Sequence, residues 1–317
     1  MFKIVKSTEE GTLEELDLRH LSKGCWIDIV DPSPEELYEI MKVTGIREDF
    51  LQPALDDDEK SRIELEDDQM LIITDIPILR ANNDYETIPL AIIATENYTV
   101  TLCLEPNRVT ADFGEHNART FATYKRTRFI FQILYKSATL YLRYIRTMVK
   151  RTDELEKHLR QSQENKDLFA LLDMQNSMTY FSTSLRSDSI VMERLMRVRT
   201  STQAKQIIKV YEEDEDLLED AIIEYKQALE MVEMTSHILN NIIEVSASLI
   251  SNNLNQVMKL LASLTIILAI PTLISGLWGM NVPVPFAENP MGFFMVLSGA
   301  IALAFLAAIL LYKKNML

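Results

Sequence analysis

Two long runs without charged side chains close this chain, and they constrain its fold more than any other feature. After Lys259 no charged residue appears before Glu288. An uncharged apolar helix of about 20 residues is long enough to cross the hydrocarbon core of a bilayer, which is about 30 Å thick. The sequence therefore predicts one membrane span over Val257–Asn281 and a second over Met291–Tyr312, joined by the short loop Val282–Pro290.

The positive charges next to these spans predict their orientation. Lys259 lies near the start of the first span, and Lys313 and Lys314 follow the second, in a basic tail of residues 313–317. The loop contains no Lys or Arg and a single acid, Glu288. Because Lys and Arg beside spans are retained in the cytoplasm, we expect both chain ends to be cytoplasmic and the loop to be external.

The part of the chain outside the membrane is strongly acidic. It contains 29 basic and 46 acidic residues, a formal net charge of −17. This charge argues against nucleic acid or an anionic lipid surface as a partner and favours cations as counter-ions. A solvated acidic surface accounts for most of the charge.

Residues 1–110 alternate between short β-rich runs and polar turns, which is typical of an α/β domain. Between two such runs, Ser33 is placed to cap a helix that has Pro34 at its first position. We predict strands at Phe2–Val5, Cys25–Val30, Arg62–Leu65, Met70–Ile76, Ile88–Ala94 and Thr99–Leu104.

The next segment, residues 111–256, is predicted to form long helices. From Glu115 to Ser275 there is no glycine, and the only proline is Pro271, inside the first span. We expect a break near Thr200–Gln203 and then helix as far as Trp278, about 110 Å long at 1.5 Å per residue. Such a helix would be a stalk between the cytoplasmic domain and the membrane. The alternative is a series of shorter helices, with a kink at Pro271.

The sequence does not indicate an enzyme. It lacks a Walker loop and a dinucleotide-binding glycine fingerprint, and four of its eight glycines come after Ser275. The four histidines are far apart, without the spacing of metal ligands: His20, His116, His158 and His237. Any ion flux must therefore be driven by the ion gradient and the membrane potential.

The first span closes on the segment SGLWGMN, which ends in Gly279, Met280 and Asn281. Gly279 lets the backbone leave the helix, and Trp278 has the amphipathic ring expected at the headgroup level. From these general properties alone, Asn281 is equally well explained as one more interfacial polar residue.

The tripeptide at the end of the penultimate span, the two C-terminal spans, the acidic loop and the lysine-ended tail together resemble the CorA family of magnesium transporters. The family more often has Tyr where this chain has Trp278, and some relatives assigned to zinc have Val in place of Met280.

The resemblance implies a homopentameric funnel whose first spans line one axial pore. Independently, a chain with two spans cannot enclose an aqueous path, so permeation requires several copies. Mg²⁺ holds its inner water shell tightly. A ring of Asn281 carboxamides, within the filter Gly279–Asn281, would accept hydrogen bonds from those waters and select a hydrated ion. Glu288 would raise the local cation concentration at the entrance.

Helical spacing places a set of first-span residues near one face, which is predicted to line the pore. About half of such residues are equally well explained by packing against the second span. Met258 and Leu261 are candidates for an apolar constriction that gates by dewetting. The set predicted to line the pore is Asn255, Met258, Leu261, Thr265 and Thr272.

An acidic run, residues 212–216, lies on the predicted stalk, and the ordinary explanation is a solvated face. By distance from the pore tripeptide, Asp220 and Glu244 resemble stalk acids that bind regulatory magnesium between subunits in the family. Asp216 and Asp84 complete the candidate regulatory set, but the acid that the family has on its N-terminal domain has no clean counterpart here. Intracellular Mg²⁺ would screen these acids and hold the pore shut.

The sequence thus predicts a homo-oligomeric channel in the bacterial inner (cytoplasmic) membrane, conducting Mg²⁺ inward, with Mg²⁺ as both transported and regulatory ion. Two alternatives remain open. The first is a transporter of the same family that prefers cobalt, nickel or zinc. A membrane-anchored helical scaffold or sensor without flux is the main alternative of another class.

Overall fold

The computed structural model describes residues 1–316 except 82, 163–164, 199–206, 209 and 287–288. Two compact units are distinguished, Met1–Ile243 and Glu244–Leu317, and one helix, α7, runs through the boundary between them. The strands are β1 (Phe2–Ser7), β2 (Leu13–Glu15), β3 (Trp26–Val30), β4 (Arg62–Glu66), β5 (Gln69–Leu79), β6 (Tyr85–Ala94) and β7 (Thr99–Cys103). The α-helices are α1 (Pro34–Thr44), α2 (Glu48–Leu51), α3 (Arg108–Ala111), α4 (Arg126–Ser162), α5 (Asn165–Val198), α7 (Glu212–Trp278) and α8 (Gly292–Lys313). Three 3₁₀ turns are η1 (Leu18–His20), η2 (Gln52–Leu55) and η3 (Glu115–Asn117).

The first unit is built around one mixed sheet with the strand order β2-β1-β3-β7-β6-β5-β4. β3 and β7 are parallel and the other neighbouring pairs are antiparallel. All six predicted strands are present, with ends shifted by a few residues. β2 was not predicted, because its three residues Leu-Glu-Glu have no apolar alternation.

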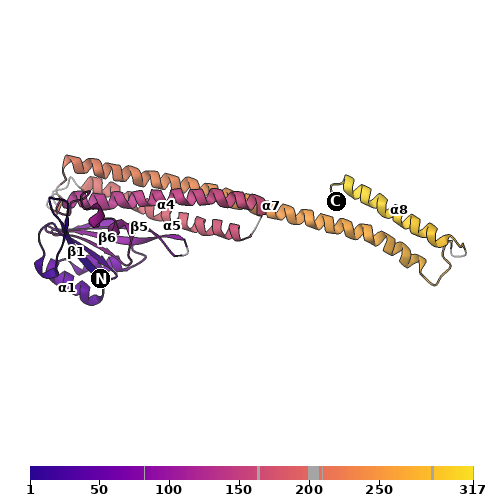
Figure 1. Ribbon diagram of the computed structural model, residues 1–317, viewed down its shortest axis with the longest axis horizontal. Helices are drawn as coiled ribbons and strands as arrows, with labels where there is room; N and C mark the ends of the chain where they lie inside the picture. Colours follow the sequence, from indigo (N-terminus) through magenta and orange to yellow (C-terminus); the bar gives the residue numbers. More distant parts are fainter. Residues whose placement is uncertain (82, 163–164, 199–206, 209, 287–288, 317) are drawn as a thin grey trace. The chain divides into compact units, whose positions relative to one another are not determined.

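The two faces of this sheet are covered by different helices, as Figure 1 shows. On β5, Met70 and Ile72 belong to the cluster that includes α4, α5 and the first part of α7, whereas Leu71 and Ile73 belong to the cluster beneath α1 and α2. Side chains alternate between the faces of a strand, so a strand buried on both faces reads as a continuous apolar run.

The helix predicted to start at Ser33 begins as expected. Ser33 Oγ accepts a hydrogen bond from the Glu36 N–H at 3.2 Å, and a Glu36 carboxylate oxygen accepts from the Ser33 N–H at 2.9 Å. This reciprocal capping box satisfies two amides that the helix leaves unpaired. Gly45 ends α1 with φ of 70°, a left-handed conformation that favours glycine.

The long helices predicted after the sheet are also present. α4 has 37 residues, α5 has 34 and α7 has 67. The break predicted near Thr200–Gln203 lies outside the described residues, and α7 begins at Glu212. Pro271 lies inside α7, which the helix accommodates without ending there.

Within its described residues, the second unit contains two helices that are long and apolar enough to cross a membrane, the C-terminal part of α7 and α8. Their large apolar side chains are exposed in the chain itself: Leu268 is 68% exposed, Leu273 66% and Phe305 68%. Contiguous apolar surface of this extent is unusual on a soluble protein and is expected where lipid or neighbouring helices cover it.

Within the first unit, Asp28 on β3 makes the stability of the sheet depend on pH. Its Oδ1 accepts a hydrogen bond from Thr101 Oγ1 at 2.7 Å, and the Trp26 indole N–H donates to the same hydroxyl at 2.8 Å. Part of the Asp28 residue reaches the surface, yet protein atoms surround its carboxyl group. Desolvation therefore raises the pKa of Asp28 to about 6, although the Thr101 hydrogen bond opposes the shift.

We predict that Asp28→Asn becomes increasingly stabilising as the pH rises. The pKa is higher in the folded chain than in the unfolded chain, so the contribution of Asp28 to stability is lost as the pH rises through about 6. Relative to the parent, the free energy of unfolding of the variant should gain about 1–2 kcal/mol between low and neutral pH. Denaturant unfolding of the full chain at several pH values measures this, with the exposed Glu35→Gln as control. A difference that does not change with pH would contradict the prediction.

Candidate ion-conduction site

The C-terminal end of α7 turns directly into the segment that carries the predicted filter. Gly279 N–H donates to the Ser275 carbonyl at 2.9 Å, and Val282 N–H donates to the Met280 carbonyl at 2.9 Å. A Cβ at position 279 would lie 3.2 Å from the Ser275 oxygen, which is tighter than most such contacts. Gly279 therefore permits the close turn that carries the chain from the helix to Asn281.

Asn281 is exposed in this turn. Among the described residues, no side chain or backbone group forms a hydrogen bond with its carboxamide. Trp278 beside it donates from its indole N–H to the Pro285 carbonyl at 3.1 Å, which ties the end of α7 to the loop. The carboxamide is therefore available to a ligand, with one acceptor oxygen and two N–H donors.

The residues predicted to line the pore all lie on α7, and their side chains reach the surface of the chain. Met258 is 57% exposed and Leu261 60%. Thr265 and Thr272 donate their hydroxyl hydrogens to the carbonyls of Leu261 and Leu268, at 2.8 and 2.9 Å. Each hydroxyl oxygen therefore keeps acceptor capacity toward a hydrated cation.

A shallow groove of about 670 Å³ runs along this part of α7. It brings together Thr265 and Thr272, but Asn255, Met258 and Leu261 lie outside it. Leu268 and Leu277, which the sequence did not single out, contribute to its lining. The groove is lined by Thr265, Leu268, Ala269, Thr272, Leu273, Gly276 and Leu277.

The loop between the spans is shaped by one close approach. Gly292 N–H donates to the Asn289 carbonyl at 2.8 Å, and Asn289 N–H donates to the Phe286 carbonyl at 3.2 Å. A Cβ at Gly292 would come within 2.2 Å of the Phe286 oxygen, so only glycine fits. Glu288, the predicted entrance acid, lies outside the described residues.

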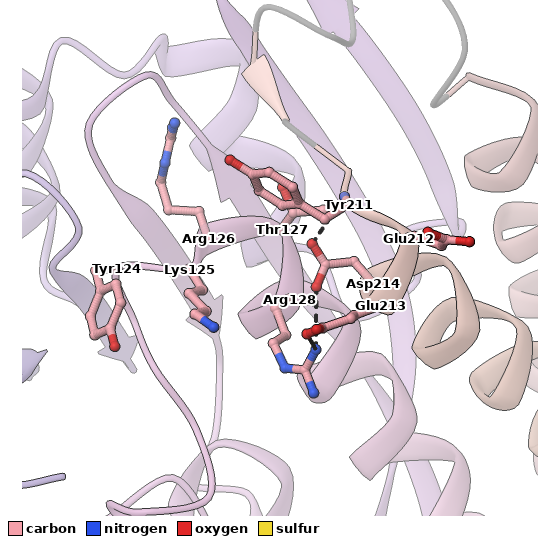
Figure 2. Close-up of a pocket in the computed structure, with 9 residues that line it drawn as sticks. All are labelled: Tyr124, Lys125, Arg126, Thr127, Arg128, Tyr211, Glu212, Glu213 and Asp214. Carbon is pink, nitrogen blue, oxygen red and sulfur yellow. Dashed lines mark hydrogen bonds and ion pairs between the residues drawn. The ribbon is translucent and has the colours of Figure 1, made fainter. Parts of the chain in front are cut away.

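The acidic run at the start of α7 is only partly a solvated face. Asp214 is 5% exposed and accepts a hydrogen bond from the Tyr211 N–H at 3.3 Å. Figure 2 shows Arg128 of α4 reaching toward the carboxylates of Glu213 and Asp214, at 3.6 and 3.5 Å. Solvation does not explain Asp214, which joins the first turn of α7 to α4. The sequence feature that could have indicated this capping role is an acid in the first helical turn, three residues after the backbone amide that it caps.

This contact borders a cavity of about 780 Å³ that both helix ends line. Its walls carry charges of both signs, from residues 124–128 and 211–214 (Figure 2).

The four acids predicted to bind regulatory magnesium are not brought together within the described part of one chain. Asp216 and Asp220 are exposed on α7 in the first unit, and Glu244 is exposed on α7 in the second. Asp84 is half-buried at the turn between β5 and β6, where its carbonyl accepts from the Arg80 N–H at 2.9 Å. No group of three or more His, Cys, Asp or Glu side chains among the described residues is placed to hold a metal ion.

Comparison with known proteins identifies the family. A family model for CorA-like Mg²⁺ transporter proteins matches residues 22–314. The chain belongs to this family. It is 28% identical over 312 residues to the cobalt/magnesium transport protein CorA of Methanocaldococcus jannaschii, covering 94% of each protein. It is 26% identical over 323 residues to the magnesium transport protein CorA of Campylobacter jejuni (strain RM1221), covering 95% of this chain and 93% of that protein.

The fold agrees with the family. The complete structure of the CorA magnesium transporter from M. jannaschii matches 99% of this chain and 96% of its own, with a TM-score of 0.80 and 25% identity. The predicted class, an α/β N-terminal domain followed by long helices and two C-terminal apolar helices, is confirmed. CorA proteins are membrane ion transporters and not enzymes, so this chain is a member of a Mg²⁺ and Co²⁺ transporter family.

We predict that Gly292→Ala distorts the loop between α7 and α8. The added methyl group meets the Phe286 carbonyl, so the loop must move and the end of α7 moves with it. Mg²⁺ flux in proteoliposomes should fall at least severalfold. The matched control is Gly299→Ala on the same helix, where an added Cβ meets no atom of the chain within 4 Å. Equal flux in the two variants would show that the close approach at Gly292 does not matter.

Proposed function

We propose that this protein is a homopentameric channel for hydrated Mg²⁺, with Gly279, Met280 and Asn281 as its filter. The observation that carries the proposal is the exposed Asn281 carboxamide without a hydrogen-bond partner in the described chain, at the outer end of an apolar helix. A polar group so placed needs water or an ion's hydration shell as its partner.

The chemistry of Mg²⁺ favours recognition of the hydrated ion. Mg²⁺ requires octahedral oxygen ligands at about 2.1 Å and gives up water reluctantly. Carboxamide oxygens from a ring of Asn281 side chains accept hydrogen bonds from the waters that the ion retains. The filter then selects by the size and polarisation of the hydrated ion and needs no fixed negative charge.

Several copies of the chain must surround the conduction path. The exposed apolar side chains of α7 and α8 require cover from lipid or from other copies, and two helices cannot enclose a water-filled pore. In such a ring, the exposed Met258 and Leu261 side chains form the apolar constriction, and Thr265 and Thr272 offer hydroxyl oxygens along the path. The number five follows the family resemblance.

Removal of the carboxamide tests the filter. Asn281→Ala should abolish Mg²⁺ uptake into proteoliposomes, a loss of at least tenfold, and leave the oligomer intact on size-exclusion chromatography. Val282→Ala, at an exposed neighbouring position, is the control and should keep most of the flux. If the Asn281 variant conducts like the parent, the filter assignment is wrong. If the parent itself shows no flux, the scaffold alternative is favoured.

The acids on α7 support a regulatory role for intracellular Mg²⁺. Asp216, Asp220 and Glu244 are exposed, and no metal-binding group of acids forms within the described part of one chain. The regulatory site therefore requires acids from neighbouring copies, with Asp84 as the candidate partner. Bound Mg²⁺ neutralises the facing carboxylates and favours the closed state; when the ion is scarce, repulsion favours opening.

Asp220→Ala is expected to weaken this control. Uptake by the variant should continue at internal Mg²⁺ concentrations that stop the parent, because one carboxylate of the proposed inter-subunit site is missing. The measurement is flux into proteoliposomes preloaded with increasing Mg²⁺. Glu219→Ala removes a neighbouring exposed acid and should close like the parent. Normal closure of the Asp220 variant would remove this residue from the site.

Orientation and energetics complete the proposal. Lys259, Lys313 and Lys314 lie in the cytoplasm of a cell whose inner membrane holds the channel, and both termini are cytoplasmic. Mg²⁺ enters down its electrochemical gradient, since a divalent cation gains about 4.6 kcal/mol per 100 mV of inward negative potential. Co²⁺, Ni²⁺ and Zn²⁺ are the competing ions to rank in flux assays.

A further inference from the structure

A fully buried carboxylate lies inside the first unit, where the sheet meets three long helices. Asp188 of α5 is 0% exposed. Its Oδ1 accepts a hydrogen bond from the Asp75 N–H of β5 at 3.0 Å, whereas its Oδ2 has no partner among the described residues. Burying a carboxylate oxygen without a partner is strongly unfavourable, so the group requires an explanation.

Four hydroxyl groups near Asp188 are also buried and without a hydrogen-bond partner in the described chain. The Ser61 and Thr74 hydroxyls face the Asp188 carboxyl group, and the Thr74 and Ser137 hydroxyls face the Tyr225 hydroxyl. Yet none of these pairs makes a hydrogen bond of ordinary distance and geometry. We call this group of buried oxygens without a hydrogen-bond partner the Asp188 chamber: Asp188 Oδ2, Ser61 Oγ, Thr74 Oγ1, Ser137 Oγ and Tyr225 OH.

Four helices and strands, and the residue before a fifth, contribute to the chamber. Thr74 is on β5, Ser137 on α4, Asp188 on α5 and Tyr225 on α7, while Ser61 directly precedes β4. Thr74, Ser137, Asp188 and Tyr225 are each 0% exposed.

The charge of the chamber is not balanced by protein. No Lys, Arg or His in the described residues forms an ion pair with Asp188 or Asp75. Burial, followed by the nearby Asp75 carboxylate, raises the pKa of Asp188 well above its usual range. A positively charged partner, or a proton, is therefore needed to stabilise the buried carboxyl group.

We propose that the Asp188 chamber binds one alkali-metal cation, K⁺ or Na⁺, through Asp188 Oδ2 and the surrounding hydroxyl oxygens. An all-oxygen donor set matches hard cations, and this set contains one carboxylate, Asp188, with the Asp75 carboxylate nearby. A divalent ion requires more carboxylate ligands, and no group of three acids is present in the described residues.

The position of this cation gives it a structural role. Tyr225 belongs to the helix that continues into the first predicted span, and the other ligands belong to the sheet, to α4 and to α5. The ion therefore ties the first part of α7 to the folded body of the domain. This site is distinct from the filter and from the exposed acids Asp216, Asp220 and Glu244.

Thermal unfolding of the full-length protein in detergent tests the proposal. EDTA is present throughout to remove divalent ions, and KCl, NaCl or N-methylglucamine chloride is added at equal ionic strength. KCl or NaCl should raise the Tm of the parent by several degrees in a saturable manner, relative to N-methylglucamine chloride. Asp188→Asn should remove this cation dependence, whereas Asp173→Asn, an exposed acid on the same helix, should retain it.

Tyr225→Phe provides a second variant that keeps the ring packing and removes only one ligand. It should require a severalfold higher alkali concentration to reach the same Tm shift. Crystals of the parent soaked in Tl⁺, a K⁺ substitute, should give an anomalous peak in the chamber that Asp188→Asn lacks.

Three results would overturn the assignment. Equal Tm of the parent in all three salts, without a Tl⁺ peak, would mean that Asp188 is a protonated, neutral acid. A cation effect that survives in Asp188→Asn would place the ion elsewhere. An Asp188-dependent shift seen only when Mg²⁺ replaces EDTA would make the site divalent.

Discussion

The bilayer requires every backbone polar group that it surrounds to find a partner within the protein, and α7 meets this requirement as a 67-residue helix. The same helix carries Asp214 and Tyr225 in the first unit and Asn281 just beyond its end. The folded α/β unit, the exposed acids Asp216, Asp220 and Glu244, and the segment proposed as the filter are thereby linked by one hydrogen-bonded element. Pro271 is tolerated inside it because neighbouring groups can satisfy the carbonyl that proline leaves free.

Patterns that repeat over many residues were predictable from the sequence. The two uncharged runs predicted the apolar helices, and the absence of glycine predicted α4, α5 and α7. The Ser33 and Glu36 spacing predicted a helix start that the structure confirms through two hydrogen bonds. Each of these signals is local, so no tertiary contact was needed to interpret it.

Contacts between distant segments were not predictable. Asp214 appeared as one acid in an exposed run, but it is buried and pairs with Arg128, which is 86 residues away in the chain. The burial of Asp188 could not be predicted from the sequence. A single acid in a helix does not indicate that the Asp75 N–H of β5 donates a hydrogen bond to it. The filter assignment to Gly279, Met280 and Asn281 stays a prediction from the tripeptide, and the structure adds that the Asn281 side chain is exposed without a partner in the described chain.

The acidic residues of this chain fall into two physical classes that call for different cations. Exposed carboxylates such as Asp220 stay hydrated, and only close approach of several of them makes a divalent ion favourable. A buried carboxylate such as Asp188 has lost its water, so even one requires a partner of opposite charge or a proton. Occupancy of a site made of exposed carboxylates changes with the concentration of the ion, which suits regulation. An ion bound to a buried carboxylate is part of the folded structure. The net negative charge of the sequence therefore does not identify the metal sites. Burial decides whether an acid is suited to a divalent ion shared with other acids or to a single partner inside the fold.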